Sequence, residues 1–283
     1  MVWTAVEANV YWGLFSLALL AIALWEFFGA WRPVSKQLVR RWTNHAVLLI
    51  VSTLLAGLLF RTTAVYVAIA VSGSRFGLLN HSSAPLLVRT IAGILILDLF
   101  QYGMHRLYHA VPALWRIHRV HHSDPELDLS TGLRHHPLEA LLQQASLLAF
   151  VALLAPPAVS VFAIELLGLF QDFFTHANAN LPTWVEKPLR AVLITPEMHR
   201  IHHADEMRDQ NANLGEVFPW WDRLFGTYME APSAGADGIQ IGLKGCQGPE
   251  AARLPFMLAE PFRSDPAGVP QPRAAAAPAI LKP

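Results

Sequence analysis

Residues 116–125 read RIHRVHHSDP and residues 198–206 read MHRIHHADE, so the pattern H-R-[VI]-H-H occurs twice in this chain. In each copy the histidines are spaced i, i+3 and i+4, and this spacing places three imidazoles on one face of a helix. Imidazole nitrogens bind zinc, copper, iron and nickel, and neighbouring histidines on a helix can converge on one ion. The two copies therefore predict two helical segments that deliver metal ligands.

A third histidine motif lies upstream, where residues 98–109 read DLFQYGMHRLYH. A helix advances by about 100° per residue, so His105 and His109 share one stripe with Asp98. A carboxylate without a partner inside an apolar span is costly, so Asp98 needs a polar role. We expect it to accept a hydrogen bond from an imidazole and so orient that ring.

The histidines are concentrated in one part of the chain, since 11 of the 13 lie between His105 and His203. A single H-x-x-x-H is more often a polar helix surface than a ligand pair, but three motifs at ligand spacing argue against that interpretation. Their eight imidazoles exceed what one ion binds, so the sequence predicts two ions. The predicted catalytic and metal-binding histidines are His105, His109, His118, His121, His122, His199, His202 and His203.

Two further histidines are candidate ligands. His176 stands in FTHANAN, at the point where a long apolar run stops. His135 and His136 stand in RHHPLE, where Pro137 suits the first turn of a helix. We expect His176 to be a ligand, and His136 rather than His135 to approach the metals.

The composition is that of a membrane protein. The chain has 283 residues, of which 53% are hydrophobic and 15% are charged, and its mean hydropathy is +0.34. Soluble domains carry about a quarter charged residues. Lys and Arg balance Asp and Glu at 21 each, so no basic field points to nucleic acid. Cys246 is the single cysteine, which excludes an intrachain disulfide and a thiolate metal cluster.

Long apolar stretches predict four to five transmembrane helices. The first three spans are predicted at residues 8–25, 46–70 and 84–104. A fourth apolar stretch, residues 138–175, is interrupted by Pro156-Pro157, and a proline pair ends a helix. Two short spans joined by a turn are favoured there over a re-entrant hairpin. The predicted fold is thus an all-α integral membrane protein, and we expect no cleavable signal peptide.

The distribution of Lys and Arg predicts the orientation, because positive residues favour the cytoplasmic side. The loop after the second span holds only Arg75, whereas the loop after the first span is strongly basic. That first loop is therefore expected in the cytoplasm, with the N-terminus outside. Every histidine motif then falls on the cytoplasmic face, in a histidine-rich helical cap on the inner or cell membrane if the source is bacterial. The basic residues of the first loop are Arg32, Lys36, Arg40 and Arg41.

Three regions follow from these patterns. Residues 1–85 are predicted to hold N-terminal transmembrane helices, and residues 86–230 to hold the catalytic domain with all three histidine motifs. Residues 231–283 contain nine prolines and an AAAA run, which predict a partly ordered strap followed by a disordered end. No H-E-x-x-H, G-x-S-x-G, dinucleotide fingerprint, phosphate loop or H-P-G-G haem motif is present.

With these motifs in place, about residues 90–230 resemble the fatty acid hydroxylase superfamily, in particular its sterol desaturase branch. The order and spacing of six blocks carry the resemblance. They are residues 98–109, LWRIHRVHHS at 114–123, RHHPLE at 134–139, FTHANANLP at 174–182, TPEMHRIHHADE at 195–206 and NLGEVFPWWDRLFGTY at 213–228.

The resemblance implies a bundle of membrane helices whose cytosolic cap holds two iron ions. Family members use O2 and two electrons to hydroxylate or desaturate a C–H bond of a lipid such as a sterol or a fatty acyl chain. The three motifs would supply eight ligands, and His176 matches the family's histidine before the last motif. Some members carry another histidine where this chain has Asn178 and Asn180, and His136 could make up that difference. The electrons would come from a separate ferredoxin, cytochrome or reductase.

Two other interpretations remain open. A membrane carrier of metal or haem could also cluster histidines, but it would need ionisable residues throughout the membrane interior. Asp98 and Glu165 are the obvious carboxylates there. A non-catalytic member of the superfamily is disfavoured, because all three motifs are intact.

Overall fold

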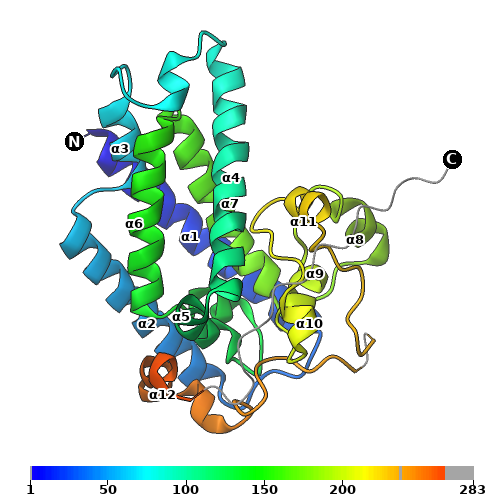
Figure 1. Cartoon of the computed structure of the whole chain (residues 1–283). Helices are drawn as coiled ribbons and strands as arrows, with labels where there is room; N and C mark the ends of the chain where they lie inside the picture. Colours follow the sequence, from blue (N-terminus) through cyan, green and yellow to red (C-terminus); the bar gives the residue numbers. More distant parts are fainter. Residues whose placement is uncertain (1, 236–237, 265–283) are drawn as a thin grey trace, which may run out of the picture.

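The computed structural model describes residues 2–235 and 238–264, and in this part of the chain the regular elements are helices (Figure 1). Residues 265–283, the last part of the predicted tail over 231–283, lie outside the described residues. The first seven α-helices and two short 3-10 helices are α1 (Val2–Gly29), α2 (Leu38–Phe60), α3 (Ala64–Val71), η1 (Leu78–His81), α4 (Leu86–Ala110), α5 (Pro112–His122), η2 (Leu129–Leu133), α6 (Pro137–Leu154) and α7 (Ala158–His176).

The remaining elements are short and form the cap beside one end of the bundle (Figure 1). They are α8 (Thr183–Leu189), α9 (Pro196–His202), α10 (Met207–Gln210), α11 (Trp220–Phe225), η4 (Pro249–Ala252), α12 (Leu254–Ala259) and η5 (Glu260–Phe262). The last of them returns to the bundle, because Arg119 of α5 forms an ion pair with Glu260 at 3.3 Å.

Within the described residues, five helical segments are long and apolar enough to cross a membrane, which confirms the predicted all-α fold. The prediction that the proline pair separates two spans is also confirmed. Ala155 ends α6 in the left-handed conformation, with φ of 49°, and α7 begins after Pro157. The spans are 8–29, 38–71, 86–110, 137–154 and 158–176.

The second span differs from the prediction of one helix over residues 46–70. It begins at Leu38, and Arg61 breaks it because this residue is left-handed, with φ of 53°. Thr63 then starts α3 by accepting a hydrogen bond from the backbone N–H of Tyr66. The span is therefore two helices in series, with a polar break between them.

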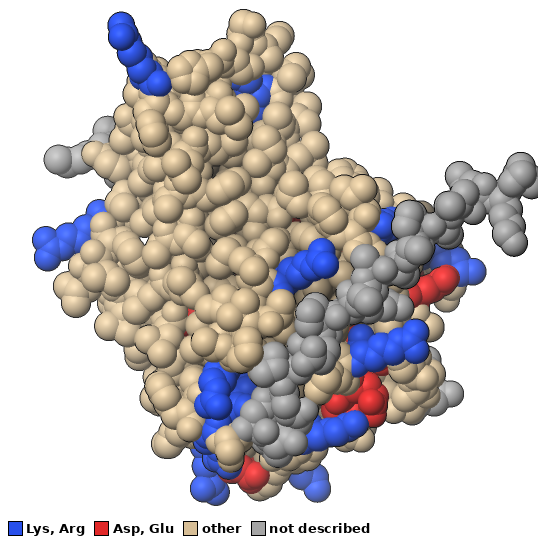
Figure 2. All heavy atoms as spheres, in the orientation of Figure 1, with Lys and Arg blue, Asp and Glu red and all other residues tan. Residues whose placement is uncertain are grey.

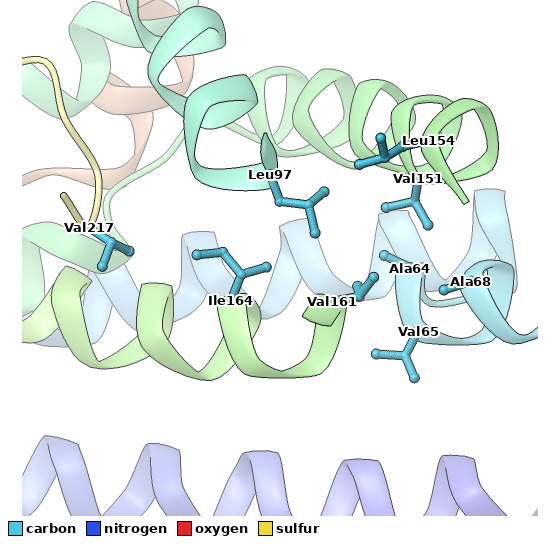
Figure 3. Packing of buried hydrophobic residues seen from close by; sticks show 9 residues of the cluster. All are labelled: Ala64, Val65, Ala68, Leu97, Val151, Leu154, Val161, Ile164 and Val217. Atoms are coloured by element: carbon cyan, nitrogen blue, oxygen red, sulfur yellow. The ribbon is translucent and has the colours of Figure 1, made fainter. Parts of the chain in front are cut away.

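Small and branched side chains hold the bundle together away from the cap. Figure 3 shows Leu97 of α4, Val151 of α6 and Ile164 of α7 meeting α3 in one buried apolar cluster. A side chain at Gly93 would meet Ser160 at 2.7 Å, so α4 and α7 touch closely there. Large apolar residues cover the outside of the bundle instead, and the charged residues on the face in Figure 2 lie mostly over the end that carries the cap. This distribution is typical of helices in contact with lipid.

A buried ion-pair network joins the second span to the segment after the second histidine motif. Arg41 lies inside α2, not in a loop, and is 2% exposed. Its guanidinium donates to Asp124 at 2.7 Å and to Asp128 at 2.5 Å. Arg41 therefore has a structural role that its place in a basic stretch did not predict.

Replacing Arg41 with alanine is expected to lower the free energy of unfolding by about 3–5 kcal/mol, because two buried carboxylates lose their cation. Thermal unfolding in detergent measures this loss. Arg40→Ala is the matched control, because Arg40 is exposed and donates, within the described residues, only to Gln37. This variant should change stability by less than about 0.5 kcal/mol. Equal stability of the two variants would contradict the role of the network.

Candidate metal centre and lipid cavity

Each histidine motif lies on a helix whose start or end the sequence specifies. His105 and His109 occupy the last turns of α4. The second and third motifs lie on α5 and α9, which both begin with a proline at the first helical position. Thr195 also caps α9 by accepting a hydrogen bond from the Met198 N–H.

The structure gathers nine histidines into two adjacent groups. In each group the possible ligand atoms lie within 4.8 Å of one another. The ring of His122 in the first group stacks on that of His203 in the second, with centroids 4.5 Å apart. The two groups are therefore in direct contact. The first group is His105, His109, His118, His122 and His202, and the second is His121, His176, His199 and His203.

Both H-x-x-H-H motifs divide their histidines between the groups. The i, i+4 pair of α5, His118 and His122, faces the first group, and the i+3 residue faces the second. The motif on α9 does the reverse, because its i+3 residue, His202, belongs to the first group. The i and i+4 positions point within about 40° of each other, whereas the i+3 and i+4 positions diverge by about 100°. Two motifs of one design therefore supply two neighbouring sites.

The second group has the geometry of ligands around one ion. The Nε2 atom of His176 lies 3.1 Å from that of His121, 2.9 Å from that of His199 and 3.2 Å from that of His203. Two nitrogens at right angles, each about 2.1 Å from an ion, would be about 3.0 Å apart. Four nitrogens that converge at this distance fit one metal ion.

The first group contains buried nitrogens that lack a hydrogen-bond partner anywhere in residues 2–235 and 238–264. Buried polar atoms are nearly always paired, so such a concentration needs an explanation. A metal ion would satisfy one nitrogen of each ring. The buried nitrogens are Nε2 of His105, His118 and His202, and both ring nitrogens of His109 and His122.

Four of the nine imidazoles are oriented from outside the groups. In each of them Nδ1 hydrogen-bonds an oxygen acceptor, which fixes the tautomer and leaves the Nε2 lone pair for a metal. The pairs are His105 with the Leu214 carbonyl at 3.0 Å, His118 with Glu139 at 2.7 Å, His176 with the Asp172 carbonyl at 2.6 Å and His202 with the Ala212 carbonyl at 3.1 Å.

Five of the histidines outside the spans are favoured in the neutral form that a metal ligand needs. Burial, together with the neighbouring imidazoles, holds the pKa of His121, His122, His199, His202 and His203 well below the ordinary value. A neutral ring offers its lone pair without first losing a proton.

The prediction that Asp98 orients an imidazole is wrong. Its carboxylate accepts hydrogen bonds from the N–H groups of Val217 and Phe218 and from Nε1 of Trp221. The helical pattern placed Asp98 correctly on α4. The loop before α11 and Trp221 of α11 lie against this position, and their N–H groups donate to both carboxylate oxygens of Asp98. Two other carboxylates contact the histidines instead. Glu216 lies 3.3 Å from Nδ1 of His105, and Glu139 bonds to His118 and, at 3.1 Å, to His135. The position of Glu139 four residues after His135 was the available sequence signal.

Replacing Asp98 with alanine is expected to lower the free energy of unfolding by about 3 kcal/mol or more, because three donors lose their acceptor. Thermal unfolding in detergent measures the loss. Asp98→Asn keeps one acceptor oxygen and should lose less. A fully stable Asp98→Ala variant would contradict this anchoring role.

His136 does not join either histidine group in the structure. Pro137 occupies the first position of α6, so His136 becomes the N-cap, and its Nδ1 accepts a hydrogen bond from the Leu138 N–H. His135 lies nearer the centre instead, with its ring stacked on His121 at 4.5 Å. The sequence favoured the wrong member of this pair because the proline-capped turn points the two rings apart.

Asn178 and Asn180 lie outside both groups. Asn178 exchanges hydrogen bonds with the backbone of Arg32, and Asn180 accepts one from Arg200. The nine histidines thus form the groups without a contribution from these positions.

A cavity of about 570 Å³ reaches the histidines from between the membrane helices. His105, His118, His121, His176 and His199 form part of its wall. Side chains of α1, α2, α4, α6 and α7 form most of the rest, so histidines of both groups border a space large enough for a small lipid chain.

Comparison with known proteins gives a consistent result. Residues 90–227 match the model of the fatty acid hydroxylase family. The chain is 31% identical over 178 residues to the ornithine lipid hydroxylase OlsE of Rhizobium tropici. This alignment covers 63% of this chain and 51% of that protein. The chain is also 36% identical over 150 residues to an alkylglycerol monooxygenase of Danio rerio, covering 52% and 31%. A fatty acid hydroxylase of a Lecanicillium species is 27% identical over 170 residues, covering 52% and 44%.

The chain spans about half or less of the length of these curated relatives. No solved structure gives a significant match.

Proposed function

Because residues 90–227 of this chain belong to the fatty acid hydroxylase family, we propose that the protein is a membrane-bound, iron-dependent oxygenase that hydroxylates a C–H bond of a lipid. The observation that carries this proposal is the position of two buried histidine groups beside a cavity that opens among membrane helices.

The residues present fit two metal ions. Neutral nitrogen donors suit iron as well as zinc and copper, and the converging Nε2 atoms have the separation of ligands on one ion. The first group would hold one ion and the second group the other. When bound, an iron pair supplies an oxidant from O2 and two electrons that is strong enough for an unactivated C–H bond.

The protein contributes binding, orientation and exclusion of water. The nine imidazoles are buried, and Glu139 and three backbone carbonyls fix four of the rings. The cavity brings a lipid to the metals from the bilayer side, which keeps bulk water from the reaction. Holding the reacting carbon beside the centre supplies proximity.

The relatives favour hydroxylation over desaturation, and a polar lipid over a sterol. Those named above are hydroxylases or monooxygenases of ornithine lipids, alkylglycerols and fatty acids. We propose a polar lipid as substrate, with a separate ferredoxin, cytochrome or reductase as electron donor. We also propose that the histidine cap lies on the cytoplasmic side and the N-terminus outside, because the basic residues between the first two spans favour that orientation.

Lipid analysis of cells with and without this chain tests the proposal. Expression should create a lipid species heavier by one oxygen atom, and the species should be absent without O2. The purified protein should hold two irons and consume O2 only when a reductant is supplied. A single exchangeable ion without O2 uptake would refute the oxygenase and indicate a metal carrier.

A further inference from the structure

Helix α11 and the turn after α8 expose large apolar side chains at one edge of the cap. Leu224 is 68% exposed and Val192 is 49% exposed. The turn and the helix are joined, because Nε1 of Trp220 donates at 2.8 Å to the carbonyl of Ala191, the residue before Val192. A group of exposed apolar side chains marks a surface that contacts another apolar phase or molecule. We call these residues the α11 edge: Val192, Trp220, Leu224 and Phe225.

The α11 edge lies beside the middle of a membrane span. Asp98 is the central residue of α4 (Leu86–Ala110), and its carboxylate accepts a hydrogen bond from Nε1 of Trp221 of α11 at 2.7 Å. One turn farther along α4, the ring of Tyr102 stacks on that of Phe225, with centroids 5.5 Å apart. Figure 1 likewise shows α11 beside the bundle, at a higher level than α10 and α12. This part of the cap therefore does not lie beyond the end of the span.

The thickness of a bilayer converts this position into a depth. A hydrocarbon core of about 30 Å is crossed by about 20 helical residues. A span that begins at Leu86 therefore leaves the core near Arg106, which is the first arginine of α4 after Arg89. Tyr102 and Asp98 precede Arg106 by about one and two turns, or about 6 and 12 Å of helix. The α11 edge is thus at the level of acyl chains, and helices that lie in a membrane interface reach a similar depth of about 5–10 Å.

The composition of the α11 edge fits lipid better than a soluble partner. Tryptophan is enriched where proteins meet the headgroup region of a bilayer. Asp222 of α11 is buried, so the exposed charged residue of this helix is Arg223. A long basic side chain can reach lipid phosphates from an apolar depth. A soluble protein could reach this edge only from within the leaflet, because the contacts with α4 fix its depth.

Helix α11 is also connected to the metal centre. Asp222 accepts hydrogen bonds from the N–H groups of Leu214 at 2.7 Å and Gly215 at 2.9 Å. The carbonyl of Leu214 bonds to Nδ1 of His105 at 3.0 Å. The helix that carries the α11 edge therefore holds the loop that orients a histidine of the first group.

We propose that the α11 edge is embedded in the leaflet on the cap side of the bilayer, where membrane lipid covers it. Its apolar side chains contact acyl chains, and Arg223 reaches the lipid phosphates. The cap is then a partly inserted structure and not a domain surrounded by water. This inference does not depend on the proposed reaction, because it concerns only how the chain meets the bilayer.

Site-specific labelling of the protein in nanodiscs with one chain each tests the proposal. The wild-type chain is the labelling blank, since its single cysteine, Cys246, is buried. A fluorophore on Leu224→Cys or Val192→Cys should be quenched by lipids that carry a nitroxide on the acyl chain. This quenching should approach that of Leu54→Cys, which is exposed on the second span. It should exceed that of Lys244→Cys, an exposed position after the cap helices α8–α11, by at least about five-fold.

Quenching at Leu224→Cys and Val192→Cys equal to that at Lys244→Cys would overturn the proposal. Iodide in the buffer then identifies what covers the edge. Labels that iodide quenches would lie in water, and labels that neither quencher reaches would be covered by protein.

A charge placed on the α11 edge gives a second test without a label. Leu224→Asp should lower the midpoint of thermal unfolding in nanodiscs by at least about 5 °C, because a carboxylate among acyl chains is costly. The control Lys244→Asp removes an exposed ion pair with Glu206 and should shift the midpoint by less than about 2 °C. A shift in Leu224→Asp no larger than that of the control would also overturn the proposal.

Discussion

Replacing His202 with alanine should reduce bound iron from two ions to one per chain and lower the rate of lipid oxygenation by at least about 1,000-fold, equivalent to about 4 kcal/mol. His202 belongs to the group of five histidines, and its orphan Nε2 atom faces that group. Its loss leaves the second group complete. Elemental analysis, together with measurement of the oxygenated lipid, checks both effects.

His121→Ala makes the complementary change, since His121 belongs to the group of four. It should also leave one iron and abolish oxygenation. His136→Ala is the matched control: this buried histidine of the same region caps α6 and joins neither group. It should retain two irons, with a stability loss of about 1 kcal/mol. Loss of iron in His136→Ala alone, or full activity in both ligand variants, would refute the assignment.

Replacing Glu139 with glutamine is expected to lower iron affinity or oxygenation by about 10- to 100-fold. Glu139 accepts hydrogen bonds from Nδ1 of both His118 and His135. Both rings bond the same oxygen, Oε1, and a neutral amide oxygen is a weaker acceptor than a carboxylate, so both rings are held less firmly. Glutamine has nearly the same volume, which separates this effect from a loss of packing.

Iron titration of the purified protein and the rate of lipid oxygenation together measure the effect. Glu230→Gln, an exposed carboxyl of the cap, is the control and should leave both quantities unchanged. Wild-type iron affinity and rate in Glu139→Gln would show that the carboxylate does not orient the ligand.

Several features followed from local sequence because they depend on short-range geometry. Spans can be recognised from long uncharged runs, and the break between α6 and α7 from Pro156-Pro157, since proline cannot continue a helix. The histidine motifs could be recognised for the same reason, because their spacing repeats within one or two helical turns. The family resemblance then agreed with the match over residues 90–227.

Residues whose partners lie far along the chain were predicted poorly. Asp98 accepts hydrogen bonds from the Val217 N–H and from Trp221 of α11, more than 100 positions away. Arg41 pairs with Asp124, 83 positions away. A basic residue in a basic stretch and a carboxylate on a histidine stripe have several plausible partners, and only the path of the chain in space selects one.

The sequence by itself determined which histidines share a helix face, because the 3.6-residue period fixes the directions of neighbouring side chains. It also determined that the first of these faces, with His105 and His109, ends an apolar span. Only the tertiary structure decided how the two H-x-x-H-H motifs divide between the groups, with His121 in one and His202 in the other. That division depends on how α5 and α9 are placed against α4 and α7, and contacts between distant segments set this placement.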